Sequence, residues 1–387
     1  MAIYKGNKKV VAVYKGSTPI NKIYKGVTLV FQKSGGGNTH LFEGTATGNF
    51  DLKINDSPIP ITPDADGKWF YDTDEELTTL ANSFYNASAV TSVDLSNLVS
   101  TGLSAKSMFQ KCSNITSIKF NNTKSMKLSN VQYMFSGCKS LVSLDLSNFD
   151  TSSLKNAAQM FYGCSSLTSI NFSSFDTSNI KNADYLFADC SSLVSLDVSS
   201  FDTSKMTSAI SLFSDCSSLV SLDLSSWNTS NLREANYLFR FCSSLVSLDL
   251  SNWNTSKLTG ASSLFEGCKS LVSLDLSSWN TSNLEYVGYL FAGCKSLTSL
   301  DLSSFNTSNL KQVHCLFEGC TSLETLDLSN FDMSNVTFDV NMFNNCTSLS
   351  TIKCKQTFKD WCITNQDSIK LPTAMREGGS GTWEIVA

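Results

Sequence analysis

The sequence predicts an α/β solenoid in which each coil contributes a short strand, a turn and a short helix. A cysteine recurs at a constant step, at Cys112, Cys138, Cys164, Cys190, Cys216, Cys242, Cys268, Cys294, Cys320 and Cys346. The segments between them repeat most of their letters, as in CKSLVSLDLSSWNTSNLEYVGYLFAG and CKSLTSLDLSSFNTSNLKQVHCLFEG. Self-similarity at a fixed period of this length is typical of stacked repeats. A content of 41% hydrophobic residues in 387 provides for a large core.

The leucines of each coil predict the strand. Leu271, Leu274 and Leu276 have the spacing L-x-x-L-x-L. Because alternate residues of a strand point to opposite faces, Leu274 and Leu276 share one face while Ser273 and Asp275 share the other. The leucines are therefore expected in the core.

The segment after the strand predicts a turn and a helix. An aromatic residue, Trp279, precedes the polar segment Asn-Thr-Ser-Asn, whose short side chains accept hydrogen bonds from free N–H groups at a helix start. Ser282 and Glu285 have capping-box spacing. Apolar residues then recur at about helical period up to the next cysteine, which predicts a short helix in every coil.

The ten cysteines that recur at the constant step are named the cysteine ladder. The residue before each of them predicts the end of a helix. Eight of the ten are types that tolerate the left-handed conformation, namely Gly137, Gly163, Asp189, Asp215, Gly267, Gly293, Gly319 and Asn345. Lys111 and Phe241 break the pattern. We expect the cysteines to be buried free thiols, since disulfides between neighbours would pull coils out of register and zinc sites need closer Cys or His pairs.

Units such as SLVSLDLSSWNTSN followed by YLFRFC resemble the BspA-like leucine-rich repeats of bacterial surface proteins, which have the same period. The resemblance covers about residues 83–353 and implies a right-handed leucine-rich coil with a non-enzymatic adhesion or recognition role. This chain departs from the common pattern by placing aromatics where many such repeats have asparagine, at Phe149, Phe175, Phe201, Trp227, Trp253, Trp279, Phe305 and Phe331. Their spacing after the strand leucines favours core filling over sugar stacking.

The chain ends predict additional modules. Tyr-Lys-Gly recurs with a period of ten at Tyr4, Tyr14 and Tyr24, which predicts three short strands too small to form their own core. We therefore interpret residues 1–33 as a β docking module that uses these tyrosines, followed by a Gly-rich linker at 34–39. Residues 40–82 are expected to form a β N-cap, 83–353 the solenoid, and 354–387 a C-terminal cap.

The opening segment IYKGNKKVVAVYKGSTPINKIYKGVTLVF also looks like the N-terminal part of some virion proteins of crAss-like and related gut bacteriophages. This resemblance implies attachment to other virion proteins through residues 1–33. It also accounts for a chain that shows neither an apparent signal peptide nor an apolar run long enough for membrane insertion.

The composition argues against several function classes. There are two histidines, His40 and His314, and no nucleotide-binding, hydrolase or zinc-protease motif, so we expect no catalytic residues, no cofactor and no enzyme. His314 is expected to have a surface or packing role. The net charge of −5 with no long basic cluster argues against a nucleic-acid partner.

A row of carboxylates follows the outward strand position of six consecutive coils, at Asp197, Asp223, Asp249, Asp275, Asp301 and Asp327. Solvation by water and flanking serines is the favoured interpretation, because hard cations usually need more ligands than one carboxylate per strand. Weak cation sites or acceptors for a polyhydroxyl ligand are the alternative. Differences among coils concentrate instead on the helical side, which is the more suitable surface for specific contacts.

These observations lead to one functional hypothesis and two alternatives. The first is a virion fibre or decoration protein, made in the host cytoplasm, that docks by its N-terminus and presents the solenoid to a host-surface protein or glycan, with a homotrimer as the guessed assembly. The runner-up is a bacterial cell-surface adhesin of the BspA-like class. A glycan-active enzyme is the third and is disfavoured, because no acid–base pair stands apart from the repeat.

Overall fold

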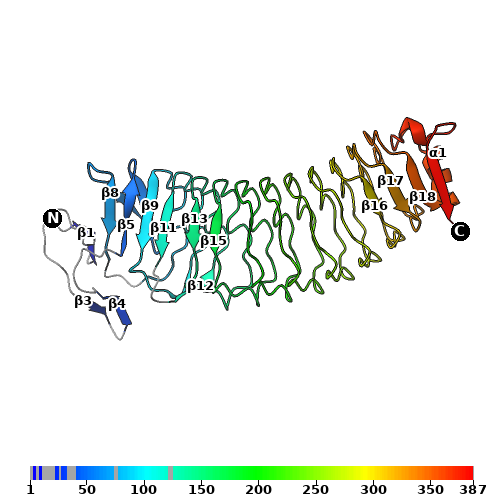
Figure 1. Cartoon of the computed structure of the whole chain (residues 1–387). Coiled ribbons are helices and arrows are strands. Elements are labelled where there is room, and N and C mark those ends of the chain that lie inside the picture. The colour runs from blue at the N-terminus through cyan, green and yellow to red at the C-terminus, as the bar shows by residue number, and fades with distance from the viewer. Residues whose placement is uncertain are drawn as a thin grey trace. The chain divides into compact units, whose positions relative to one another are not determined.

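The computed structural model describes the strand residues 3–5, 8–10, 22–25 and 28–32 and then residues 41–73, 77–120 and 125–386. The chain divides into two compact units. Unit 1 comprises Met1–Leu154 and Ser169–Phe175, and unit 2 comprises Lys155–Thr168 and Asp176–Ala387. Figure 1 shows that the repeats form stacked coils. The prediction of a leucine-rich solenoid is confirmed, with corrections to its strands and helices described below.

The N-terminal segment forms two antiparallel hairpins. The first pairs β1 (Ile3–Lys5) with β2 (Lys8–Val10), and the second pairs β3 (Lys22–Lys25) with β4 (Thr28–Gln32). Tyr4 lies on β1 and Tyr24 on β3, whereas Tyr14, the linker 34–39 and His40 lie outside the described residues. The docking role of the three tyrosines stays a prediction.

Unit 1 continues with a four-stranded sheet of order β11-β9-β5-β8. It contains β5 (Phe42–Ala46), β8 (Lys68–Tyr71), β9 (Val90–Leu95) and β11 (Ser117–Phe120). β5 is antiparallel to β8 and β9, whereas β9 and β11 are parallel, so the sheet changes direction where the repeats begin. A separate hairpin joins β6 (Phe50–Ile54) to β7 (Ser57–Ile61). Its turn lies at Asn55 and Asp56, and both residues have positive φ.

The remaining strands of unit 1 are parallel. One sheet has the order β10-β12-β14, formed by β10 (Thr101–Ser104), β12 (Met126–Asn130) and β14 (Phe149–Asp150). β13 (Ser143–Asp145) pairs with β15 (Ser169–Asn171), so that Ser143 lies opposite Ser169, its equivalent in the next coil. The register of this pair therefore equals one period of the repeat.

Unit 2 ends in a parallel sheet of order β16-β17-β18-β19, visible in Figure 1. Its strands are β16 (Ser299–Asp301), β17 (Thr325–Leu328), β18 (Thr351–Lys355) and β19 (Thr382–Val386). The helix α1 (Gln356–Thr364) and the 3₁₀ turn η1 (Thr373–Met375) lie between the last two strands in sequence. From Asp176 to Thr298 the chain forms no regular strand, so the strand predicted at Leu271–Leu276 and its equivalents is absent from these coils. Parallel bridges such as Asn182–Ser208 and Gly260–Tyr286 join equivalent residues of neighbouring coils there.

The expected helix in each coil is wrong. In the described part of the chain α1 is the one α-helix, and it lies after the repeats. Between Leu284 and Cys294, alternate N–H groups donate to the next coil: Tyr289 to His314 (3.0 Å), Phe291 to Leu316 (3.0 Å) and Gly293 to Glu318 (2.6 Å). The intervening N–H groups close tight turns to the residue three positions back. Half of the backbone N–H groups that would form hydrogen bonds within a helix therefore bond to the next coil instead, so a helix cannot form.

Each coil has two residues in the left-handed conformation. The stop before the cysteine is confirmed, since all eight predicted residues have φ between 60° and 76°. Lys111 (65°) and Phe241 (56°) adopt it as well, although their types do not favour it. A second left-handed position lies four residues earlier and was not predicted, at Ser107, Tyr133, Gln159, Tyr185, Ser211, Tyr237, Ser263, Tyr289, Cys315 and Asn341.

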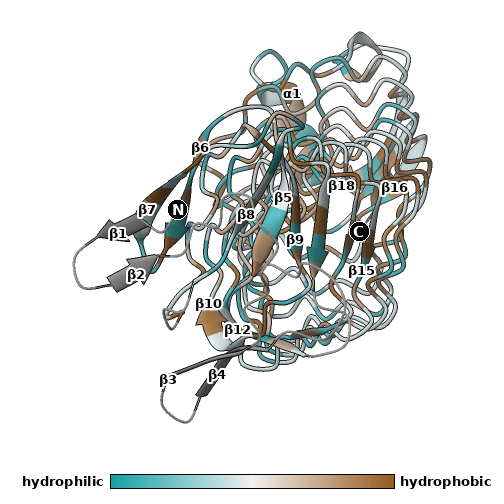
Figure 2. Cartoon of the chain, turned by 90° about the vertical axis from the view of Figure 1, so that its left-hand side faces the viewer, coloured by the Kyte–Doolittle hydropathy of each residue, from teal (hydrophilic) through white to brown (hydrophobic). Residues whose placement is uncertain are grey.

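The core of unit 2 consists of columns of identical positions. The phenylalanines three residues before the cysteines stack from Phe161 to Phe343, with ring centroids 5.4–6.0 Å apart. The predicted aromatic column is also buried throughout, and Trp253 stacks on Trp279 with centroids 6.3 Å apart. The core-filling interpretation is confirmed. Figure 2 shows hydrophilic and hydrophobic segments alternating along the coils, as one buried and one exposed face require.

The cysteine ladder is confirmed as free and buried. Its thiols also have hydrogen-bond partners that the sequence did not reveal. The Sγ of Cys268 donates to the carbonyl of Phe239 (3.2 Å), and Cys294 donates to Phe265 in the same way. Burial raises the pKa of Cys268 to about 12.

A column of buried threonines also links the coils. The hydroxyl of Thr281 donates to the carbonyl of Asn306 (3.1 Å) and accepts from the N–H of the same residue (2.7 Å). Thr203, Thr229 and Thr307 make the same pair of bonds. The expected capping role of the preceding asparagines is correct in part, since Asn280 accepts from the N–H of Ser282, but no helix follows.

Candidate functional site

Unit 2 exposes two surfaces that differ in character. We define the strand face as the exposed positions of the strand segments, represented by Val194, Ser195 and Asp197 and their equivalents in the other coils. We define the turn face as residues 181–189 and their equivalents. The strand face repeats nearly unchanged, with exposed Val194, Val220, Val246 and Val272 in four consecutive coils. The turn face changes from coil to coil.

The predicted carboxylate row lies on the strand face, where each aspartate stabilises a turn. The carboxylates of Asp249 and Asp275 each accept from the backbone N–H two residues further on, at 2.9 Å. These backbone donors, at Ser251 and Ser277, hold the pKa of both carboxyl groups below the ordinary value. The other four members make the same bond, at Asp197, Asp223, Asp301 and Asp327.

The last aspartate of this row has a cationic partner. Lys353 Nζ lies 2.8 Å from Asp327 Oδ2, at the strand register where earlier coils place another aspartate. Among the described residues, no three His, Cys, Asp or Glu side chains converge as metal ligands would. Weak cation binding by the row stays a prediction, whereas the bonds to the serine N–H groups give the carboxylates a structural role.

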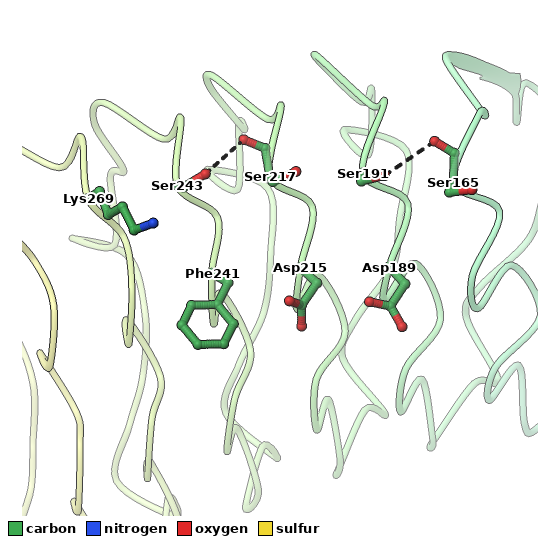
Figure 3. A pocket seen from close by; sticks show the side chains of 8 residues that line it. All are labelled: Ser165, Asp189, Ser191, Asp215, Ser217, Phe241, Ser243 and Lys269. Atoms are coloured by element: carbon green, nitrogen blue, oxygen red, sulfur yellow. Dashed lines mark hydrogen bonds between the residues drawn. The ribbon is translucent and has the colours of Figure 1, made fainter.

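A groove of about 400 Å³ lies beside the cysteine ladder of unit 2 (Figure 3). Residues directly before the cysteines form one side, namely Asp189, Asp215 and Phe241. Residues directly after the cysteines form the other, namely Ser165, Ser191, Ser217, Ser243 and Lys269. Four other coils of this unit have glycine before the cysteine, at Gly163, Gly267, Gly293 and Gly319. The groove is therefore built by three consecutive departures from glycine.

The groove is negatively charged at one end. Figure 3 shows the Asp189 and Asp215 side chains next to each other, with Lys269 at the opposite end. Burial, followed by the charge of Asp215, raises the pKa of Asp189. The Ser214 hydroxyl lies 2.7 Å from Asp215 Oδ2, and Asp189 bonds to the Tyr162 hydroxyl. Neither carboxylate forms a salt bridge with any described residue.

Phe241 is held by the coil that follows it. Its N–H donates to the carbonyl of Glu266 (2.6 Å), and the Arg240 guanidinium lies 4.2 Å from the centre of its ring. Arg240 in turn pairs with Glu266, at 2.9 Å. A Cβ atom on Gly267 would overlap the Phe241 ring. Glycine at position 267 is therefore required by both its φ of 74° and this close approach.

A row of tyrosines lies on the turn face, at the second left-handed position. We name Tyr185, Tyr237 and Tyr289 the tyrosine row. Their side chains are 37%, 39% and 37% exposed. In the coils between them the same position holds Ser211 and Ser263, which are buried. The sequence signal was the alternation of Tyr and Ser at this position, but the helix prediction concealed its meaning.

His314 packs beside the end of this row. Its ring lies edge-on to Tyr289, with centroids 5.0 Å apart, and contacts Phe338 at 4.8 Å. Gly288 leaves space for the imidazole, since a Cβ atom there would overlap it. Burial lowers the pKa of His314. The ring therefore has the packing role that the sequence predicted.

Solved structures that match this chain share little sequence with it. A leucine-rich cell surface protein from Faecalibacterium prausnitzii A2-165 is 15% identical, with a TM-score of 0.34, and the match covers 95% of this chain and 97% of that one. TLR13, in a complex with ssRNA13, is 19% identical, with a TM-score of 0.27, and the match covers 75% of this chain and 51% of that one. A comparison with curated proteins found no match.

A family model matches most of the repeats. The model is described as "Mycoplasma protein of unknown function, DUF285" and matches residues 103–220, 129–246, 166–273 and 237–361, which together span more than half of the chain. Within the described residues, no helix has the length and apolar character needed to cross a membrane. Its repeats place this leucine-rich solenoid in the DUF285 family.

Proposed function

We propose that this protein is a non-enzymatic recognition scaffold of the bacterial surface-adhesin type, and that it binds its ligand on the turn face of unit 2. The observation that carries this proposal is the contrast between the two faces. A repeat whose side chains stay constant on one face and vary on the other is expected to make its specific contacts on the variable face. The groove at Asp189, Asp215 and Phe241 is the most differentiated part of the turn face.

The chemistry of the groove supports binding rather than catalysis. A glycoside hydrolase needs two carboxyl groups that flank the scissile bond from different sides. In Figure 3 Asp189 and Asp215 project from neighbouring coils in the same direction. The thirteen cysteines are buried, and none lines the groove as a nucleophile. The pair instead offers acceptors and negative charge to a bound partner.

A virion location is the alternative to the surface-adhesin type. It depends on the resemblance of the Tyr-Lys-Gly segment to phage virion proteins, and none of the matches above is to a virion protein. The cell surface is therefore the better-supported location. Antibodies against unit 2 should label intact producing cells; labelling confined to purified phage particles would favour the virion instead.

Binding by the turn face can be tested with variants that follow the repeat itself. The triple change Asp189→Gly, Asp215→Gly and Phe241→Gly installs the residue that other coils have at this position, so the fold should be kept. The matched control replaces Val194, Val220 and Val246 on the strand face with serine. Both variants and the parent are applied to immobilised glycans and extracellular proteins.

We expect the parent to bind, the groove variant to bind at least tenfold more weakly, and the strand-face variant to bind like the parent. Loss of binding in the strand-face variant alone would place the ligand on the other surface. A parent that binds none of the immobilised molecules would contradict the proposal.

A further inference from the structure

The tyrosine row has a period of two coils. Neighbouring coils are separated by about one interstrand distance, so the backbone positions of Tyr185, Tyr237 and Tyr289 recur roughly every 10 Å. The three residues are exposed to nearly the same extent. The surface therefore presents three aromatic side chains at equivalent positions of alternate coils.

The fold does not require tyrosine at these positions. Ser211 and Ser263 adopt φ of 54° and 57°, close to the 57°, 62° and 59° of the tyrosines. The N–H groups of Ser211 and Tyr237 make the same bond to the next coil, at 2.9 Å each. A left-handed conformation is unfavourable for a bulky residue. Three tyrosines at a position where serine suffices need an explanation other than folding.

The rings are braced by their neighbours. Tyr162 lies edge-on to Tyr185 with centroids 6.3 Å apart, and His314 lies edge-on to Tyr289 at 5.0 Å. The Arg240 guanidinium lies 5.8 Å from the centre of the Tyr237 ring. A tyrosine held in this way loses little conformational freedom when a ligand covers it, and its ring and hydroxyl contact both apolar and polar groups.

The row is polar on the side of the groove. Tyr162 contacts Tyr185 through its ring and Asp189 through its hydroxyl, which links the row to the two carboxylates of the groove. Carboxylates accept hydrogen bonds strongly. They also repel anionic ligands, and the chain has a net charge of −5. A ligand that satisfies both features has apolar ring faces, many hydroxyl donors and no negative charge.

We infer that the tyrosine row binds an uncharged or amino-substituted polysaccharide, laid across the coils with its sugar rings against Tyr185, Tyr237 and Tyr289. An extended polysaccharide with a disaccharide repeat presents the same ring face at intervals of about this order. This inference rests on the proposed recognition function and names the ligand class for the same face.

The test uses the full chain and soluble polysaccharides of known composition. The neutral or amino-substituted probes are a β-linked glucan, a mannan and an N-acetylglucosamine oligomer; the anionic probes are a polyuronate and a sulfated glycan. Dissociation constants are measured by calorimetry for the parent and for the triple variant Tyr185→Ser, Tyr237→Ser and Tyr289→Ser. Thermal unfolding confirms that each variant is folded.

An exposed tyrosine outside the row, Tyr286, provides the matched control. Tyr286 is 41% exposed but lies outside the row, and the bridged residue in the next coil is Gln312. The control variant is therefore Tyr286→Gln, which exchanges one natural occupant of that position for another.

We expect the parent to bind at least one neutral or amino-substituted probe and none of the anionic ones. The triple variant should lose at least tenfold in affinity, each single variant a smaller part of that loss, and Tyr286→Gln less than twofold. Equal binding by parent and triple variant would overturn the role of the row while leaving recognition by the turn face intact.

Two further results separate this inference from the proposed function. A parent that binds extracellular proteins but no polysaccharide refutes the inference alone. A parent that binds neither refutes both.

Discussion

The strand face and the turn face of unit 2 are built from the same coils but follow different rules. On the strand face, most coils have the same residue at the same position, and the carboxylate of each aspartate is engaged by its own turn, as at Asp275 and Ser277. On the turn face, backbone bonds between coils fix the path of the chain, so side chains such as Asp189, Asp215 and Phe241 can differ. Because the backbone bonds between coils are the same in each coil, the side chains of the turn face can change without changing the path of the chain.

The largest expected effect on the free energy of unfolding is at Gly267 on the turn face. Gly267→Ala should lower the free energy of unfolding by about 2–4 kcal/mol, from the left-handed backbone and the overlap with the Phe241 ring together. Gly293→Ala has a similar φ of 72°, but its Cβ would meet the neighbouring Gly267 backbone at an ordinary 3.5 Å, so only the backbone cost applies. Urea unfolding of both variants measures the difference.

Making Gly267→Ala and Gly293→Ala in a Phe241→Gly background completes a double-mutant cycle. The extra cost at Gly267 should disappear there, because no ring remains to be displaced. If Gly267→Ala and Gly293→Ala are equally destabilising with Phe241 present, the close approach has no energetic consequence.

A second prediction compares the buried link between coils with an exposed residue of the strand face. Thr281→Val keeps the shape but leaves the N–H and carbonyl of Asn306 without the threonine hydroxyl. We expect a loss of about 1–2 kcal/mol, since two partly buried hydrogen bonds are removed. Ser273→Ala on the strand face should change stability by less than about 0.5 kcal/mol. Comparable losses in the two variants, measured by urea unfolding, would show that the threonine bonds contribute little.

A third prediction concerns the cysteine ladder, which separates the two faces. Cys268→Ala removes a buried sulfur and its bond to the Phe239 carbonyl. That carbonyl still accepts from the N–H of Cys242, so the expected loss is about 1–2 kcal/mol. In the parent, thiol-labelling reagents should react with the described cysteines only after unfolding, since burial raises the pKa of Cys268 to about 12. Rapid labelling of several thiols in the native protein would contradict this packing.

The smallest expected effect concerns two aspartates, Asp275 on the strand face and Asp189 on the turn face. Replacing each by asparagine should change the stability of the protein in opposite directions. The pKa of Asp275 is lowered by the N–H of Ser277, so its ionised form adds stability above the unfolded pKa, and this is lost as the pH falls through the folded pKa. The pKa of Asp189 is raised by burial and by Asp215, so its favourable term is present below the unfolded pKa and is lost as the pH rises through the folded pKa.

At neutral pH, therefore, Asp275→Asn should lower the melting temperature and Asp189→Asn should raise it. Both differences from the parent should shrink as the pH falls below the ordinary carboxyl pKa of 3.8. Shifts of the same sign at neutral pH would show that the two carboxylates have similar environments.

The sequence predicted those parts of the fold that depend on residues close to one another in the chain. The leucine spacing placed Leu274 and Leu276 in the core, and the period gave the register at which Asp301 pairs with Asp327. Small residues before the cysteines indicated the left-handed stop. Each of these features is repeated many times, so a single deviation such as Lys111 did not obscure it.

The sequence predicted helices that are absent and did not predict the groove, because both features depend on contacts between coils that the local sequence does not show. Apolar residues between Leu284 and Cys294 have helical spacing, yet alternate N–H groups of this segment bond to carbonyls of the next coil. Asp189, Asp215 and Phe241 were noted only as variants of a stop residue. Because each lies one full repeat from the next in the chain, their meeting at one groove becomes visible only when the coils are stacked.

The bonds from each coil to the next have a consequence for how the gene can change. Because equivalent atoms of successive coils are joined in the same way, a duplication or deletion of one whole repeat creates one new junction that resembles the old ones. Removal of residues 295–320 would leave the groove and Gly267 untouched, whereas removal of residues 217–242 would take Phe241 away and erase part of the tyrosine row. A change in the number of coils therefore alters the proposed binding surface only when the repeat that is lost carries part of the groove or of the tyrosine row.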